Sequence, residues 1–269
     1  MRASWVDSHC HLQSLDDPGD AMERARVAGV VGMVCVGTDL ETSRRAVELA
    51  AGQPSVRATV GLHPHDASRL AAEWEQLEDL AAADRVVGVG ETGFDFHYRH
   101  SPADEQEVAF REQIRLAKRL DRALVVHSRD AWDATFRVLA DEGVPARTIL
   151  HCFTGGPDEA RRALDLGAFL SFSGIVTFPN ADDPRAAAAV TPLDRLLVET
   201  DAPYLAPCRT AGARTSPDTS RWWGPRSRRP PDARTPTSPA RPPPVPPPPS
   251  PICPIGRIRR LFDGAEGLR

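Results

Sequence analysis

Short apolar segments alternate with longer amphipathic segments along roughly the first 200 residues of the chain. The apolar segments are three to five residues long and rich in Val, Ile, Leu and Ala, as is typical of strands buried on both faces. The sequence predicts eight such strands, at residues 5–8, 32–36, 57–61, 86–90, 123–126, 148–150, 168–172 and 195–198.

The segments between the predicted strands contain strong helix formers and carry polar residues along one face. Clear examples are residues 20–28, 40–51, 104–120, 131–142 and 157–166. An alternation of strand and helix repeated eight times favours an α/β fold, a parallel (β/α)8 TIM barrel. From this pattern alone, an open doubly wound sheet remains the alternative.

The composition changes abruptly near Cys208, where Pro, Arg, Ser and Thr become dominant and lead into a proline run at residues 242–249. Proline lacks the backbone donor that helix and sheet interiors need, so we expect a disordered or polyproline II segment. The sequence therefore predicts two parts, a barrel over residues 1–207 and a Pro/Arg-rich tail over residues 208–269.

The net charge of −4 conceals a difference between these two parts. Residues 1–207 carry 21 basic and 33 acidic side chains, a balance of 21 − 33 = −12, whereas the tail carries 12 and 4, a balance of +8. An acidic barrel argues against a broad nonspecific grip on duplex DNA.

Five cysteines without C-x-x-C spacing suggest neither a disulfide framework nor a zinc knuckle, and a reducing cytoplasm fits them best. No stretch approaches the roughly 18 apolar residues that a membrane span needs, so we expect a cytoplasmic protein without a membrane partner.

Histidines and carboxylates occur where the predicted strands end. His9 and His11 close the first strand, and because strand side chains alternate, both point to one face while Cys10 points to the other. The others follow later strands: Glu91, His127, His151 and Asp201. Each alone could be a backbone cap or an ion-pair partner, but six of them at the carboxyl rim of one barrel favour a dinuclear metal site.

Six motifs then show a resemblance to the TatD family of amidohydrolase-like barrels, and it extends over residues 4–207. They are Asp7-Ser8-His9-Cys10-His11-Leu12, Gly61-Leu62-His63-Pro64-His65, Gly90-Glu91-Thr92-Gly93-Phe94-Asp95, Val126-His127-Ser128-Arg129, His151-Cys152-Phe153-Thr154-Gly155 and Glu199-Thr200-Asp201-Ala202-Pro203-Tyr204-Leu205. The resemblance implies a metal-dependent hydrolase that cleaves phosphodiester bonds as an exodeoxyribonuclease, with DNA, single-stranded or at ends, as substrate and no obligate protein partner.

Carried over to this chain, the resemblance implies two divalent metal ions. One ion would be held by His9, His11 and Asp201, the other by His127 and His151, with Glu91 bridging both. Glu91 and Asp201 are then the catalytic carboxylates, and Asp201 would accept a proton or orient the attacking water. The donor set admits Mg, Mn, Zn or Ni.

Three further residues keep two interpretations each. His63 and His65 are candidate substrate-binding residues that contact phosphate, or they lie in a turn stiffened by Pro64 with their rings toward solvent. Glu199 shares a strand face with Asp201. It could bind a metal ion or orient the water, or it could hydrogen-bond a residue that binds the metal.

The chain departs from the family pattern after Pro207, where the family continues with an Asn-Glu-Pro loop and the last barrel helices. Restoring one G after the Pro207 codon, with GC-rich codons chosen for the residues that follow, yields a Thr-Asn-Glu-Pro text. We therefore interpret the tail as a frame-shift product and expect a barrel of the metal-dependent hydrolase type with its last helices missing, of uncertain activity.

Two other functions stay open from the sequence. One is the hydrolysis of a small cyclic amide or ester, which the same ligand set would support. The other is an inactive barrel whose Pro-rich tail binds a partner.

Overall fold

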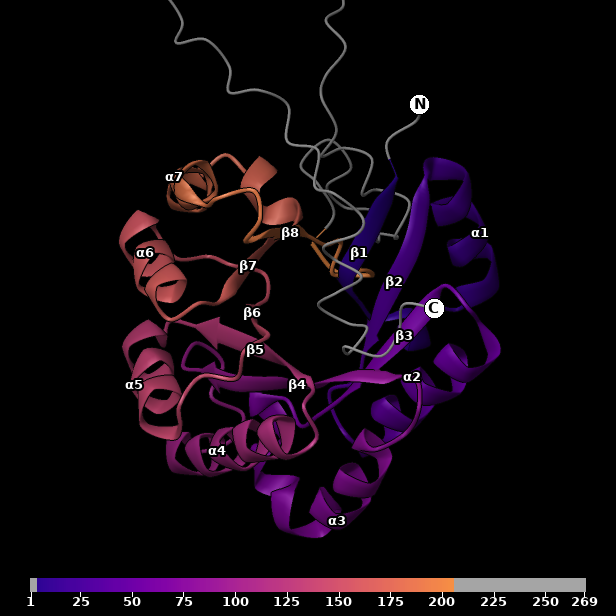
Figure 1. Ribbon diagram of the computed structural model, residues 1–269, viewed down its shortest axis with the longest axis horizontal. Coiled ribbons are helices and arrows are strands. Elements are labelled where there is room, and N and C mark those ends of the chain that lie inside the picture. Colours follow the sequence, from indigo (N-terminus) through magenta and orange to yellow (C-terminus); the bar gives the residue numbers. More distant parts are fainter. Residues whose placement is uncertain (1–3, 206–269) are drawn as a thin grey trace, which may run out of the picture.

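The computed structural model describes residues 4–205 of the chain. Eight parallel strands follow one another around a single sheet in the order β1 to β8, and helices surround them (Figure 1). The strands are β1 Trp5–Cys10, β2 Val30–Val36, β3 Val56–Val60, β4 Val86–Asp95, β5 Ala123–Arg129, β6 Thr148–Leu150, β7 Phe169–Phe172 and β8 Leu196–Val198. This sequential order confirms the TIM barrel and rules out the doubly wound sheet, whose strand order would reverse.

Seven α-helices and three short 3-10 helices connect the described strands. They are η1 Leu12–Ser14, α1 Pro18–Ala28, α2 Leu40–Gly52, η2 Pro64–Arg69, α3 Leu70–Ala81, α4 Ala103–Arg119, α5 Trp132–Glu142, α6 Pro157–Asp165, η3 Gly174–Thr177 and α7 Asp182–Val190. The tail and the missing last helices that we expected from the sequence lie outside the described residues, as does the frame-shift interpretation. Within residues 4–205, no helix is both long and apolar enough to cross a bilayer.

The core has two layers. Inside the barrel, small and branched side chains pack together: Val6, Val34, Val36, Val87, Ala123, Val125, Ile149 and Leu197. A larger apolar layer lies between the sheet and the helices, and Cys10 belongs to it, with its thiol donating to the carbonyl of Val34. Cys10 thus points away from the barrel interior, as strand alternation predicted.

Strand β4 is longer than the sequence indicated, because it continues from Gly90 to Asp95. Two glycines make this continuation feasible, Gly90 with φ +123° and Gly93 with φ +129°. These are backbone conformations that residues with a Cβ rarely adopt, and a Cβ on either glycine would collide with a carbonyl oxygen of β5. The register between β4 and β5 also shifts between Val89 and Thr92. As a result, Glu91 lies within β4 rather than at its end.

Hydrogen bonds between β1 and the end of β8 with its following residues bring the barrel nearly to closure. The Asp7 carboxylate accepts hydrogen bonds from the backbone N–H of Thr200 at 2.9 Å and from its hydroxyl at 2.6 Å. The Ser8 hydroxyl donates to the carbonyl of Val198 at 3.0 Å. Asp7 is fully buried, so this closure places a carboxyl group where water cannot solvate it.

Burial raises the pKa of Asp7 to about 7, although hydrogen bonds from Thr200 and the His9 amide oppose the rise. The unfolded chain therefore loses this proton more readily than the folded protein does. The contribution of Asp7 to the free energy of unfolding is therefore most favourable below about pH 3.8. It is lost as the pH rises to about 7.

We predict that Asp7→Asn, which keeps one acceptor and adds one donor, becomes increasingly more stable than the wild type as pH rises from about 5 to about 8. The full difference has an upper bound of about 4 kcal/mol, from about three pKa units. Asp7→Ala leaves the Thr200 donors without a partner and should cost about 1–3 kcal/mol relative to Asp7→Asn at every pH. Urea unfolding of the three proteins at several pH values measures this, and a gap between wild type and Asp7→Asn that does not change with pH would contradict it.

Candidate metal centre

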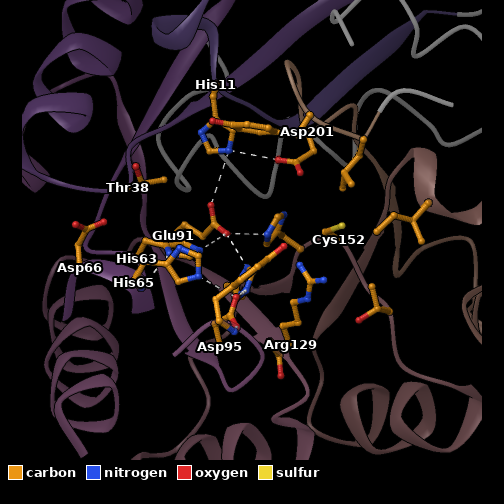
Figure 2. Close-up of a pocket in the computed structure, with 18 of the residues that line it drawn as sticks. His11, Thr38, His63, His65, Asp66, Glu91, Asp95, Arg129, Cys152 and Asp201 are labelled. Atoms are coloured by element: carbon orange, nitrogen blue, oxygen red, sulfur yellow. Dashed lines mark hydrogen bonds and ion pairs between the residues drawn. The ribbon is translucent and has the colours of Figure 1, made fainter. Parts of the chain in front are cut away.

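Side chains from both halves of the chain converge at the carboxyl end of the barrel (Figure 2). His9 lies in β1, Glu91 in β4 and His127 in β5. His11, His151 and Asp201 lie in the first residues after β1, β6 and β8, in that order. All but His9 line one open cavity of about 540 Å³. His9 is buried, and its ring stacks on that of His151. The six residues that the sequence singled out are therefore brought together.

The first cluster consists of His9, His11 and Asp201. The Nε2 atoms of His9 and His11 lie 3.3 Å apart, and the Asp201 Oδ1 atom lies 3.3 Å from His11 Nε2 and 3.7 Å from His9 Nε2. Glu91 adds its Oε2 atom at 3.3 Å from His9 Nε2. Ligands about 2.0–2.1 Å from a tetrahedral metal ion lie roughly 3.3–3.4 Å from one another. The cluster has the size and donor chemistry of a site for one divalent ion.

The second cluster surrounds the other oxygen of Glu91. Its Oε1 atom lies 2.8 Å from Nε2 of His151, 3.0 Å from Nδ1 of His127 and 3.5 Å from Nε2 of His63. Although Nε2 of His151 is this close, it is buried and makes no hydrogen bond in the described structure. A ring nitrogen aimed at a carboxylate without bonding to it is the arrangement that a shared cation would satisfy. Glu91 thus presents one oxygen to each cluster.

His63 does not lie in a solvent-facing turn, which was one of the two interpretations left open by the sequence. Its side chain is only 12% exposed, and its ring contacts those of His65 and His127 instead of facing solvent. Together with Glu91 and His127 it forms a group that could hold a metal ion. The available signal was its position shortly after β3, since His11, His151 and Asp201 also lie shortly after their strands.

Asp95 lies behind the second cluster. Its Oδ2 atom lies 3.3 Å from Nε2 of His127 and 3.0 Å from Nε2 of His65. The backbone amides of His97 and Tyr98 donate to its Oδ1 atom. Asp95 therefore fixes the orientation of the His127 ring and ties His65 to the cluster, at a distance from the Glu91 carboxylate.

Among the described residues, the charged partners of the buried Glu91 and Asp201 carboxylates are histidines. Burial opposes ionisation of Glu91, but its contacts with His151, His63 and His9 hold the pKa of this carboxyl well below its usual range. Burial also opposes protonation of His151, yet Glu91 and Glu199 raise the pKa of this ring well above its usual value. Desolvation lowers the pKa of His63 to about 4. Because no Arg or Lys within residues 4–205 pairs with Glu91 or Asp201, the site is suited to a cation.

Cys152 does not follow the alternation of strand side chains. As the residue after His151 it would point outward to the helices if the strand continued, but it lines the cavity (Figure 2), with its sulfur 3.2 Å from the Ser173 hydroxyl. The reason is local, since β6 ends at Leu150 and Cys152 has φ +42°, so the alternation does not continue to it.

A parallel eight-stranded barrel that carries clustered histidines and carboxylates at its carboxyl rim defines a TIM-barrel metal-dependent hydrolase. The comparisons with known proteins agree. The family model described as TatD related DNase matches residues 6–221. This chain belongs to the TatD family.

Relatives at about 40% identity cover most of the chain. A Bacillus subtilis protein named uncharacterized metal-dependent hydrolase YabD is 39% identical over 218 residues, 78% of this chain and 85% of that protein. A Klebsiella pneumoniae protein named 3′-5′ ssDNA/RNA exonuclease TatD is 40% identical over 195 residues, 71% of this chain and 74% of that protein. The solved structure of the TatD homologue YJJV from Escherichia coli matches with a TM-score of 0.74 at 30% identity, covering 81% of this chain and 86% of that one.

We predict that the double variant His9→Ala, His11→Ala loses the ion of the first cluster, because two of its donors are removed at once. Metal content after loading and desalting, read by mass spectrometry, measures this. The matched control is His97→Ala, His100→Ala, which removes two rim histidines that do not touch Glu91. If the His9, His11 variant keeps the metal content of the wild type, the first cluster is not a metal site.

Proposed function

We propose that this chain uses two divalent ions to remove nucleotides from the 3′ end of single-stranded DNA or RNA. The observation that carries the proposal is the Glu91 carboxylate, whose two oxygens face two separate groups of ligands on the floor of an open cavity. A pair of ions bridged by one carboxylate is a recurrent arrangement for phosphodiester cleavage. The name of the Klebsiella relative, a 3′-5′ ssDNA/RNA exonuclease, supports this substrate and direction.

In this proposal His9, His11 and Asp201 hold the first ion, His127 and His151 hold the second, with Glu91 between them. His63 is placed to add a further donor to the second ion. When bound, such ions lower the pKa of water and neutralise charge on the scissile phosphate. Mixed nitrogen and oxygen donors admit Zn, Mn, Ni or Mg. Metal analysis of the loaded protein decides among these four ions.

The carboxylate of Asp201 is available to handle a proton. Burial opposes its ionisation, but the hydrogen bond from His11 lowers the pKa of Asp201 below its usual value, so it is deprotonated at neutral pH. It lies on the cavity wall. We assign it the role of orienting the attacking water and accepting its proton.

The cavity rim supplies the substrate contacts. Both tyrosines of the chain, Tyr98 and Tyr204, line it, and their exposed fractions are 53% and 56%. Arg129, which lies over the Tyr98 ring at 4.8 Å, is the sole Arg or Lys among the lining residues that the structure describes. Exposed aromatic rings stack with unpaired bases and a guanidinium binds phosphate, a combination suited to single strands. His65, at the same rim, is an additional candidate phosphate contact.

The proposal extends to the organisation and location of the protein. Residues 1–207 would form the catalytic unit, with residues 208–269 as a separate tail. The free thiols of Cys10, Cys35 and Cys152 are usual in a reducing compartment. On that basis we propose the cytoplasm.

We predict that the metal-loaded protein shortens a 5′-labelled single-stranded oligonucleotide stepwise from its 3′ end and cuts the matched blunt duplex far more slowly. Gel analysis of the product ladder measures this. Chelation of the metal, or Asp201→Asn, should abolish the ladder. Internal fragments without a ladder, or hydrolysis of a cyclic amide in place of DNA, would contradict the proposal.

We further predict that Tyr98→Ala and Tyr204→Ala each raise KM for the oligonucleotide, by the equivalent of about 1–3 kcal/mol per lost stacking contact, with little change in kcat. The matched controls are Tyr98→Phe and Tyr204→Phe, which keep the ring and should keep KM. Arg129→Ala should raise KM most at low salt, because its contact with phosphate is electrostatic. Alanine and phenylalanine variants that behave alike would show that the rings do not bind bases.

A further inference from the structure

Glu199 is a buried carboxylate that the proposed reaction does not use. It follows β8, is 0% exposed, and makes no ion pair with Arg or Lys within residues 4–205. Its Oε1 atom accepts a hydrogen bond from the backbone N–H of Cys152 at 2.7 Å and lies 3.2 Å from Nδ1 of His151. Its Oε2 atom is buried and has no hydrogen-bond partner in the described part of the chain. A buried carboxylate oxygen without a donor is costly, so a donor is expected.

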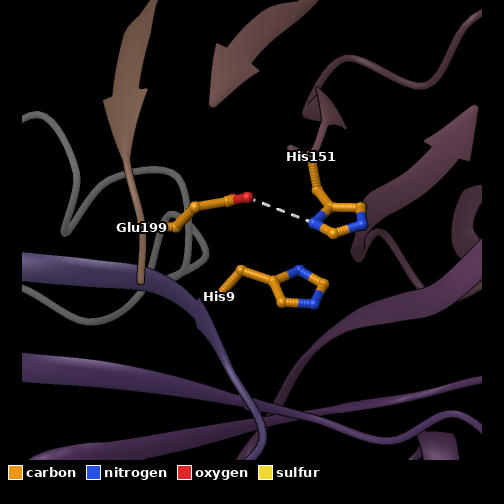
Figure 3. A group of neighbouring side chains, drawn as sticks. All are labelled: His9, His151 and Glu199. Atoms are coloured by element: carbon orange, nitrogen blue, oxygen red, sulfur yellow. Dashed lines mark hydrogen bonds and ion pairs between the residues drawn. The ribbon is translucent and has the colours of Figure 1, made fainter. Parts of the chain in front are cut away.

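The donor that matches this oxygen belongs to His9. The rings of His9 and His151 stack, with centroids 3.8 Å apart and planes 16° from parallel. Figure 3 shows the two rings beside the Glu199 side chain, His9 from β1 and His151 from the residue after β6. Ligand atoms of the three residues all lie within 4.8 Å of one another. Nδ1 of His9 is also buried without a partner.

The two rings share the same orientation relative to two carboxylates. Each has its Nε2 atom at Glu91, at 3.3 Å for His9 and 2.8 Å for His151. A neutral imidazole that offers the lone pair of Nε2 to an ion carries its proton on Nδ1, and that N–H requires an acceptor. Two N–H groups therefore arise together behind the metal site, and Glu199 has two oxygens beside them.

We infer that Glu199 is the shared acceptor for the Nδ1–H groups of His9 and His151, one oxygen to each, and so is a positioning residue for both ions at once. This inference rests on the two-ion site proposed above. His9 and His151 then bind different ions but donate to the same carboxylate. The same geometry excludes a third cation among these three residues, because both Nδ1 atoms are then protonated.

The consequence is that one substitution outside the set of metal ligands lowers the affinity of the protein for both ions. Glu199→Gln keeps the shape of the side chain but replaces one acceptor with a donor, so one imidazole N–H group would face an amide N–H group. The other imidazole N–H group would keep only a neutral acceptor in place of a charged one, which is the weaker bond. Loss of such a supporting partner typically reduces metal affinity by about 10- to 100-fold. We expect isothermal titration of the apo full-length chain with Zn²⁺ to show weaker binding at both sites.

Glu73→Gln is the matched control. Glu73 is also a buried carboxylate, and it accepts a hydrogen bond from the amide of Leu40 at 3.1 Å, but it touches no histidine of the site. This variant should lower stability without changing either Zn²⁺ affinity. Thermal unfolding of both apo variants verifies that they fold.

A second measurement observes the two N–H groups directly. The Zn²⁺-loaded wild type should show two slowly exchanging imidazole N–H resonances assigned to His9 and His151 in long-range proton–nitrogen spectra, both attached to Nδ1. Glu199→Gln should shift or broaden at least one of them. Two such signals, with both affinities reduced, support the inference.

The outcomes separate the inference from the proposed function. If the wild type binds two ions and Glu199→Gln binds both as tightly, the shared-acceptor role is wrong while the two-ion site stands. If only one affinity falls, Glu199 serves one ring and the inference is overturned. If the wild type binds a third Zn²⁺ that Glu199→Gln does not bind, these three residues hold an ion and the inference is overturned as well. If the wild type binds no ion at all, the proposed metal centre itself fails.

Discussion

The burial of the Glu91 carboxylate at the carboxyl rim of the barrel is the constraint on which the rest of the site depends. A carboxylate 3% exposed, whose charged partners within residues 4–205 are histidines, is costly to desolvate unless positive charge is supplied nearby. The fold holds Glu91 there through a strand that continues past two glycines. The surrounding rings come from β1, β5 and the segments after β3 and β6, so no single element could keep this carboxylate in place.

Much of the fold was readable from the sequence, and for a physical reason. Parallel strands of a TIM barrel are covered on both faces, so they appear as short uninterrupted apolar runs such as residues 123–126 and 148–150. Strand ends in such a barrel share one rim, which is why residues following separate runs could be expected to meet. Where the polar residues Glu91 and Thr92 interrupt the apolar run of β4, the sequence pattern predicted too early an end. Hydropathy does not register the positive-φ glycines that let the strand continue.

The site was predictable as a set of donors but not as a set of contacts. His9 and His11 are recognisable from their spacing, and His151 and Asp201 from their place after a strand. The position of His63 beside Glu91 depends on how η2 turns after β3, and the orientation of Cys152 depends on a positive φ. Neither is encoded in residue type. The same holds for the partners of Asp95 and Glu199, since hydrogen bonds across the barrel depend on register between distant strands.

The seam between β1 and β8 has a consequence for the order in which the protein is assembled. The backbone N–H of Asp201 donates to the carbonyl of His9, and that of His11 donates to the carbonyl of Ala202. The residues of the first cluster therefore come from two segments far apart in the sequence. The hydrogen-bonded pair Asp7 and Thr200 in the same two segments is separated by 193 residues. An ion held across this seam, as proposed, would act as a cross-link that closes a very long loop. A nascent chain on the ribosome therefore has no complete first site until its eighth strand has emerged, and metal uptake would mark the moment when the ring of strands is whole.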